Sequence, residues 1–135
     1  MIALDTHILA RLLLKDDSAQ FKLAKELLAG EAVFTVPTTV MLELILVLGT
    51  EDFTSAQMLQ SLRTLLGLLN FKPKSFEALC QALRWYGAGM DFGDALHLAS
   101  SAGDEVFASF DKAFGKIATQ HDTAPAVQVL RRSAK

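Results

Sequence analysis

The chain has 135 residues, a length typical of one domain; 51% of them are hydrophobic and 21% charged, which excludes an unfolded, highly charged chain. Its 13 Lys and Arg against 15 Asp and Glu give a net charge of −2, so nucleic acid could be held only by a local basic patch, not by bulk charge. A single cysteine, Cys80, excludes an internal disulfide and a Cys-rich zinc site. No apolar run is long enough to span a bilayer and no basic segment precedes the early acid Asp5, so we expect a soluble, cytoplasmic chain without a signal peptide or membrane association.

Capping residues and helix breakers divide the chain into alternating strands and helices. In the first part we expect a buried strand at 2–4, a helix at 7–14 capped by Thr6, a helix at 19–29 capped by Ser18 and ended by Gly30, a strand at 33–36, and a helix from Thr38 or Thr39 to 48 ended by Gly49. In the second part we expect a helix at 55–66 opened by a Thr54–Gln57 capping box, a strand at 68–71, a helix at 76–86 capped by Ser75, a helix from Asp91 to 102, a strand at 106–109, a short helix after Asp111, and an edge strand at 127–130.

This alternation predicts an α/β fold, in which helices flank a mostly parallel sheet of four to five strands. We expect one domain over residues 1–131 and a frayed tail at 132–135.

One acid interrupts a strongly apolar helix. Glu43 lies within 40–48, and all the remaining residues of this segment are apolar, so we expect most faces of this helix to be covered. Because burying an unpaired carboxylate costs several kcal/mol, Glu43 is expected to have a cation or a cluster of donors beside it. A structural salt bridge, or a helix face that exposes Glu43 alone, is the alternative.

Three further acids lie at helix starts. Asp5 and Asp111 each follow an apolar strand and precede a helix, and Asp94 lies on the first turn of a helix that Asp91 opens. Helix capping explains each of them taken singly. The carboxyl ends of parallel strands nevertheless meet at one edge of a sheet, where ligands bind. Clustered carboxylates repel one another unless a multivalent cation neutralises them, and oxygen donors suit Mg²⁺ or Mn²⁺, which can polarise a phosphodiester for hydrolysis.

Four segments, in register and in order, resemble PIN-domain ribonucleases, and more narrowly the VapC-type toxins of bacterial and archaeal toxin–antitoxin pairs. They are LDTHIL (4–9), VPTTVMLEL (36–44), DFGDALHLA (91–99) and SFDKAF (109–114). The resemblance implies a PIN-like three-layer α/β sandwich and a Mg²⁺- or Mn²⁺-dependent endoribonuclease, the toxin of a pair that blocks translation. It also implies an RNA substrate, a cognate antitoxin protein and a homodimer.

Carried over by position, the resemblance assigns the catalytic and metal-ligating roles to Asp5, Glu43, Asp94 and Asp111. Supporting roles fall on Thr6, His7, Asp91, His97 and Ser109. The chain departs from the family where His7 replaces a common Asn and where Ser109 replaces a common Thr. Both residues can still form hydrogen bonds, so the departures affect fine positioning and leave the expected metal site intact.

Few cations are available for an RNA backbone. Arg11, Arg84, Lys112 and Lys116 are candidates, although Lys112 and Lys116, one helical turn apart, also fit an ordinary solvated face. Trp85 and Tyr86 could stack on a base or belong to the core. Two other functions stay open: a catalytically inactive PIN-like module that only binds a partner, and a phosphatase with Asp5 as nucleophile, which is disfavoured because such sites usually have a second acid where this chain has His7.

Overall fold

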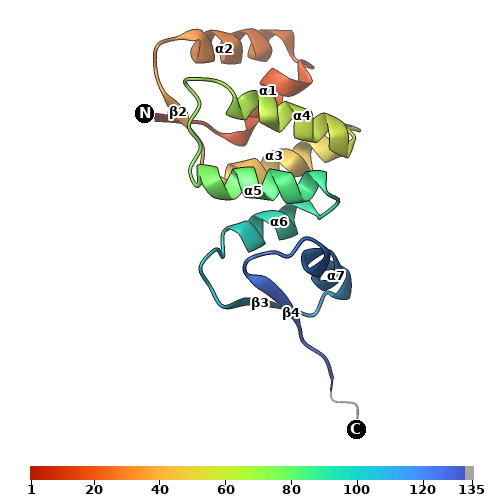
Figure 1. The fold of residues 1–135 in the computed structure, drawn as a ribbon. Coiled ribbons are helices and arrows are strands. Elements are labelled where there is room, and N and C mark those ends of the chain that lie inside the picture. Colours follow the sequence, from red (N-terminus) through yellow and green to blue (C-terminus); the bar gives the residue numbers. More distant parts are fainter. Residues whose placement is uncertain (133–135) are drawn as a thin grey trace. The chain divides into compact units, whose positions relative to one another are not determined.

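The computed structural model describes residues 1–132, which contain four strands and seven helices (Figure 1). The chain divides into two compact units: unit 1 is residues 1–76 and unit 2 begins at Glu77. The expected single domain over 1–131 stays a prediction. Of the expected frayed tail at 132–135, residues 133–135 lie outside the described residues.

Unit 1 contains two short parallel strands and four helices. Its elements are β1 (Ile2–Ala3), α1 (Thr6–Leu14), α2 (Ser18–Ala29), β2 (Phe34–Thr35), α3 (Thr38–Thr50) and α4 (Ser55–Leu66). β1 pairs with β2 in the predicted parallel direction, with Ile2 opposite Phe34 and Ala3 opposite Thr35. α1 packs on α2 and α3, and α3 packs on α4.

The core of unit 1 is aliphatic and aromatic. Its buried side chains include Leu4, Leu9, Phe34, Val36, Met41, Leu44, Leu48, Leu62, Leu65 and Phe71. The expectation of a buried first strand is wrong for Ile2 and Ala3, which are exposed, and holds for Leu4, the residue that follows β1. Burial therefore begins where the chain turns from β1 toward α1.

Several boundaries in unit 1 differ from the predicted ones by one residue. The N-caps are Asp5 and Asp17 instead of Thr6 and Ser18, because each Asp side chain accepts a hydrogen bond from a first-turn backbone N–H. α3 continues through Gly49 to Thr50. The capping box of α4, Thr54 with Gln57, is as predicted.

The strand expected at 68–71 is reduced to one bridge. Leu69 and Asn70 lie in a turn in which the Phe71 N–H donates to the Leu68 carbonyl (3.2 Å). Only Phe71 then pairs with β2, opposite Phe34. Pairing with β2 therefore begins only where the turn ends: the Asn70 carbonyl accepts from the Phe34 N–H (2.7 Å), and the Lys72 N–H donates to the Phe34 carbonyl (2.7 Å).

Unit 2 is built around a second parallel pair of strands. Its elements are α5 (Phe76–Gly87), α6 (Phe92–Ala99), β3 (Val106–Ser109), α7 (Lys112–Gln120) and β4 (Ala126–Val129), with the first residue of α5 assigned to unit 1. β3 and β4 pair in parallel from Val106–Ala126 to Ser109–Val129, and α7 connects them and packs on β4 (Figure 1). The strand at 106–109 has the predicted bounds.

Some boundaries in unit 2 were predicted incorrectly, and β4 covers Ala126–Val129 instead of 127–130. α6 ends at Ala99, not at Ala102, and the Ser101 hydroxyl donates to the His97 carbonyl (2.9 Å), as hydroxyl side chains do when they compete with helical bonds. Ser75, before α5, has a left-handed backbone (φ 55°) instead of the extended one of an N-cap. Within residues 1–132, no helix is both long and apolar enough to cross a membrane.

Candidate active site

Asp5 is held at the point where β1 ends and α1 begins. One carboxylate oxygen accepts a hydrogen bond from the Thr6 backbone N–H (2.8 Å), and the other lies 3.0 Å from Nδ1 of His7. The hydrogen bond from His7 and that from Thr6 lower the pKa of Asp5 below its ordinary value. Both side chains are largely solvent-exposed, 70% for Asp5 and 75% for His7. The carboxylate is therefore ionised, oriented and accessible.

Two buried hydroxyls lie near the ends of the strands of unit 1. Thr6, at the start of α1, and Thr35, at the end of β2, are 1% and 4% exposed. Among the described residues, neither Oγ1 atom has a hydrogen-bond partner. Thr6 therefore contacts Asp5 through its backbone N–H, and its hydroxyl is buried without a hydrogen bond to any described residue. Thr35 was missed in the sequence, although it is the one polar residue in the run 33–36.

The expectation that the Glu43 carboxylate is buried is wrong. Its side chain is exposed, and the stripe that α3 buries is formed by Met41, Leu44, Ile45 and Leu48. Leu46, 64% exposed, shows that α3 also leaves apolar side chains in solvent. The apolar neighbours of Glu43 therefore do not enclose it, and no buried cation is needed to explain it.

In unit 2, Asp91 and Asp94 have different roles at the start of α6. Asp91 is the N-cap, and its Oδ2 accepts from the Asp94 backbone N–H (3.1 Å). The Asp94 side chain is half-buried and free of this capping task. Burial, then the negative charges of Asp91 and Asp111, raise the pKa of Asp94, while the nearby exposed His97 lowers it.

Asp111 is fixed between β3 and α7. Its Oδ1 accepts from the Phe114 N–H (3.0 Å) as the N-cap of α7, and its own N–H donates to Ser109 Oγ (3.0 Å). Asp91, Asp94 and Asp111 line one cleft of about 330 Å³, whose other wall residues are apolar or glycine. Unit 2 thus brings three of the predicted carboxylates to one small cavity.

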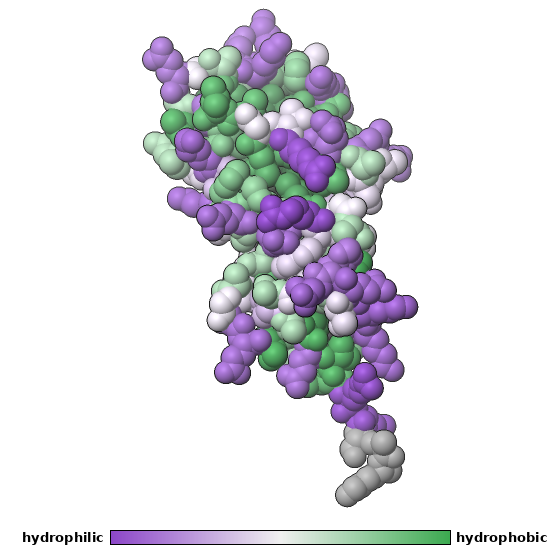
Figure 2. Space-filling model, viewed as in Figure 1, coloured by the Kyte–Doolittle hydropathy of each residue, from purple (hydrophilic) through white to green (hydrophobic). Residues whose placement is uncertain are grey.

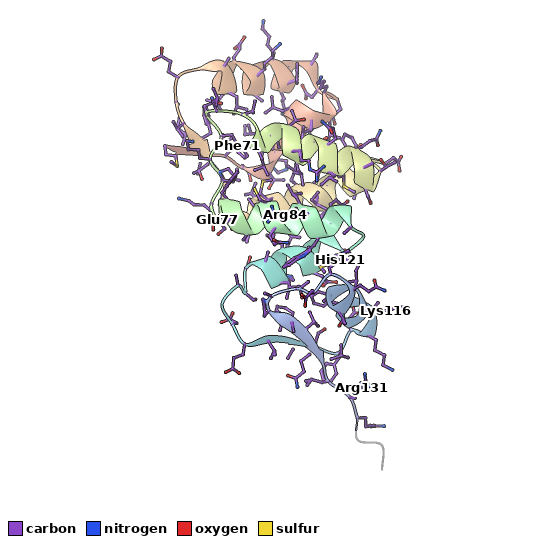
Figure 3. All side chains as sticks on the ribbon, in the orientation of Figure 1. Phe71, Glu77, Arg84, Lys116, His121 and Arg131 are labelled. Carbon is purple, nitrogen blue, oxygen red and sulfur yellow. The ribbon has the colours of Figure 1, made fainter. Side chains whose placement is uncertain are left out.

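The predicted RNA-binding cations lie in different settings. Arg11 is already paired with Asp16 (2.6 Å), and Arg84 donates to Gln81 Oε1 (2.8 Å). Lys112 and Lys116 line a separate groove on α7. Figure 3 labels Arg84 on α5 and Lys116 on α7. The aromatic pair belongs to the core: Trp85 is buried, and the Tyr86 ring packs edge-on against Phe92 at 5.6 Å.

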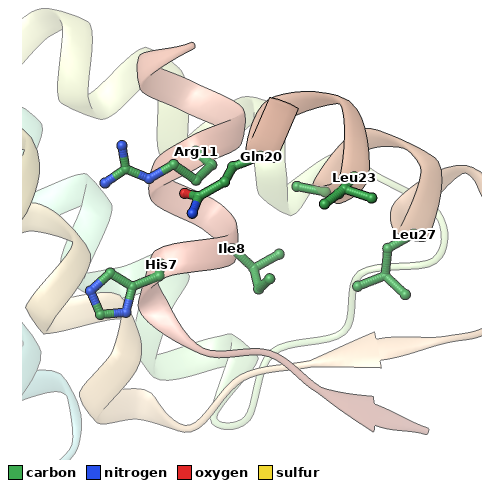
Figure 4. A pocket seen from close by; sticks show the side chains of 7 residues that line it. His7, Ile8, Arg11, Gln20, Leu23 and Leu27 are labelled. Atoms are coloured by element: carbon green, nitrogen blue, oxygen red, sulfur yellow. The ribbon is translucent and has the colours of Figure 1, made fainter. Parts of the chain in front are cut away.

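Beside His7, α1 and α2 enclose a cleft of about 440 Å³. Ile8 of α1 and Leu23 and Leu27 of α2 supply its apolar wall, and Arg11 and Gln20 supply its polar rim (Figure 4). Leu23 is 66% exposed. The cleft therefore presents apolar surface next to the Asp5–His7 pair.

The donor chemistry of both units fits a hard divalent cation. Asp5 and Glu43 in unit 1, and Asp94 and Asp111 in unit 2, offer carboxylate oxygens, which Mg²⁺ and Mn²⁺ prefer. Burial, and after it the charges of Asp91 and Asp111, raise the pKa of Asp94, and a bound cation would oppose both effects. Within residues 1–132, no three His, Cys, Asp or Glu side chains are already arranged as a metal cluster.

Both units of this α/β protein have a parallel strand followed by a capping aspartate, and unit 2 adds a further carboxylate on the first turn of α6. The family model of the PIN domain matches residues 2–120, and the chain belongs to this family. The predicted PIN-like α/β fold is thereby confirmed, while the described strands form two two-stranded parallel sheets instead of the expected single sheet of four to five strands. PIN domains are typically nucleases, which are hydrolases, and they generally use divalent metal ions. No curated protein and no solved structure matched the chain.

Proposed function

We propose that this PIN domain is a Mg²⁺- or Mn²⁺-dependent endoribonuclease and the toxin of a toxin–antitoxin pair. The observation that supports the activity best is the acidic cleft of unit 2, where Asp94 and Asp111 line one cavity and the pKa of Asp94 is raised. A half-buried carboxylate beside two others is costly to maintain unless a positive group offsets its charge. Because PIN domains generally use divalent metal ions, the family membership supports a divalent cation in that role.

In this proposal Asp5, Glu43, Asp94 and Asp111 hold the metal, which when bound would polarise the phosphodiester and favour its hydrolysis. The chain's own bonds orient these ligands. Thr6 and His7 fix the two oxygens of Asp5, and the capping bond to Phe114 fixes one oxygen of Asp111, leaving the other free. Because the ligands must be ionised, metal binding is expected to weaken in acid, and earliest at Asp94.

The test is single-turnover cleavage of a labelled single-stranded RNA. Wild type is expected to cut with Mg²⁺ or Mn²⁺ and to be silent in excess chelator, and Asp94→Asn is expected to abolish cleavage. Asp104→Asn makes the same charge change at an exposed residue outside the cleft and should keep full activity.

Cleavage that persists in chelator would overturn the metal-dependent mechanism. Activity that survives Asp94→Asn but is lost in Asp91→Asn would transfer the carboxylate role to Asp91. A wild-type chain that never cuts RNA with either metal would instead favour the inactive, partner-binding module.

The partners in this proposal are a small cognate antitoxin and a second copy of the chain. Exposed apolar side chains support such interfaces: Leu23 on α2, Leu46 on α3 and Leu69 after α4 are 66%, 64% and 93% exposed. Apolar patches on a small domain commonly mark protein interfaces. Light scattering should give a dimer, and co-expression with the neighbouring reading frame should give a complex. A strict monomer at micromolar concentration with no co-purifying neighbour would contradict this.

A further inference from the structure

Residues of helix α7 line two separate cavities: the acidic cleft and a second groove. Ala113, Phe114 and Ile117 face that cleft, whereas Lys112, Gly115, Lys116 and Thr119 line a groove of about 470 Å³. Because successive helical residues turn by about 100°, these two sets lie on opposite sides of one helix. α7 therefore lies between a negative cavity and a second, differently charged groove.

The second groove is positively charged. Its charged residues are Lys112, Lys116 and Arg131, and none of its lining residues is acidic. Among residues 1–132, none of these three cations forms an ion pair with a carboxylate. Figure 2 shows hydrophilic side chains over the region where Figure 1 places α7, and Figure 3 labels Lys116 on α7 and Arg131 on the segment that follows β4. Unpaired cations gathered in one groove favour a polyanionic occupant.

The rest of the groove is suited to an extended chain. Val127 and Val129 of β4 supply an apolar floor, and Thr119 and Gln120 supply neutral hydrogen-bonding groups. The floor comes close to α7 because position 115 is glycine, where a Cβ would overlap Cγ2 of Val129. Lysines 112 and 116 are separated by about 6 Å along the helix, so they can contact different phosphates of one strand.

We propose that the α7–β4 groove binds the phosphate backbone of single-stranded RNA on the side of α7 opposite the acidic cleft. This inference rests on the proposed ribonuclease function and adds to it a sequence-independent binding site. Asp111 caps α7 and lines the acidic cleft, while the next residue, Lys112, lines the groove. The acidic cleft and the groove therefore adjoin the same end of α7, its N-terminus. Because the groove contacts phosphates, it sets affinity and register and does not read bases.

Binding is measured in chelator, so that it does not depend on cleavage, by fluorescence anisotropy of a labelled single-stranded oligouridine titrated at several salt concentrations. The test variant carries Lys112→Gln, Lys116→Gln and Arg131→Gln. The matched control carries Lys22→Gln, Lys72→Gln and Lys74→Gln, three exposed lysines that do not line this groove. Both triple variants change the net charge equally, so bulk electrostatics cannot distinguish them.

The groove variant is expected to bind about tenfold or more weakly than wild type, whereas the control binds nearly as well. The salt dependence should also flatten: three lost phosphate contacts at about 0.7 each reduce the slope of log affinity against log salt by about 2. In cleavage assays the groove variant should raise KM and change kcat little, for every RNA sequence tried. Equal affinity and equal salt slope in the groove variant and wild type would overturn the proposal.

The outcomes separate this proposal from the proposed function. Wild type that binds RNA through these three residues but cuts none with either metal refutes the nuclease and keeps the groove. Groove variants that bind and cut like wild type refute the groove and keep the nuclease. If labelled oligoglutamate binds through the same residues while RNA affinity is unaffected by their loss, the groove serves an acidic protein segment and the proposal is wrong.

Discussion

Gly115 gives a test of the packing of α7 on β4 that does not depend on the function of the chain. A Cβ at this position would overlap Cγ2 of Val129 but would lie 3.7 Å from Val129 Cβ, an ordinary contact. Only the Cγ2 methyl group of Val129 therefore obstructs an alanine. Val129 cannot move aside easily, because its β-branched side chain is stiff and its strand is paired with β3.

Two opposing effects set the size of the change in Gly115→Ala. Replacing glycine in a helix interior gains about 1 kcal/mol, whereas overpacking a well-filled site costs about 3 kcal/mol at the upper end of its usual range. The deep overlap makes the steric cost the larger effect, so we expect a net loss of about 2 kcal/mol. For a chain of this length that lowers Tm by roughly 6–10 °C.

Val129→Ala should rescue the packing defect, since it removes the obstructing methyl group. Alone it costs about 1 kcal/mol, because Val129 is only half-buried. The double variant should then be within about 1 kcal/mol of wild type, a coupling of about 3 kcal/mol between the two sites. Gly49→Ala in α3 is the matched control, because a Cβ there meets nothing within 4 Å. It should raise stability by up to about 1 kcal/mol.

The assay is chemical denaturation followed by circular dichroism on all four variants. The reasoning fails if Gly115→Ala is as stable as wild type. It also fails if the effects of the two substitutions simply add. A Gly49→Ala variant that is destabilised as strongly as Gly115→Ala would show that alanine is disfavoured for a reason other than the contact with Val129.

Three further predictions concern the carboxylates and hydroxyls of the site, each measured in chelator. Burial and neighbouring charges raise the pKa of Asp94 above its ordinary value, so its ionisation destabilises the folded chain; Asp94→Asn should therefore melt higher than wild type near neutral pH, and thermal melts should show this advantage disappear as the pH falls and the Asp94 carboxylate becomes protonated. Asp111→Ala should lose about 1 kcal/mol in denaturation curves because α7 loses its cap, while Asp111→Asn keeps it, so equal losses would contradict the capping role. Thr6→Val replaces a buried, unpartnered hydroxyl with a methyl group and should raise stability by about 1 kcal/mol, and a lower Tm would show that the hydroxyl is satisfied after all.

Local signals in the sequence predicted local structure well. The capping box at Thr54 and Gln57, the caps at Asp91 and Asp111, and the strand at 106–109 each depend on a few consecutive residues, and the structure shows them as expected. The caps at Thr6 and Ser18 were wrong by one residue. In both places an Asp precedes the hydroxyl residue, and the Asp side chain accepts the capping hydrogen bond from a first-turn backbone N–H.

Non-local features could not be predicted in the same way. The burial expected for Glu43 depended on which face of α3 packs, and an all-apolar sequence does not specify that face. Arg131 and Val129 join Lys116 in one groove only because β4 folds back beside β3 and α7. Because these residues are separated in the sequence, no local sequence pattern indicates the groove. The roles of the four proposed metal ligands rest on the family resemblance and stay predictions.

Asp5 and Asp111 each act as the N-cap of a helix as well as a proposed metal ligand. Asn caps a helix about as well as Asp, and a single nucleotide transition converts the codon of one into that of the other. Such a change would remove a ligand charge without loosening the helix. A gene copy with this change would therefore still encode a folded protein, with one proposed metal ligand fewer. The double use of these aspartates therefore separates two properties: one codon change can remove a proposed metal ligand while the helix cap, and with it the fold, is kept.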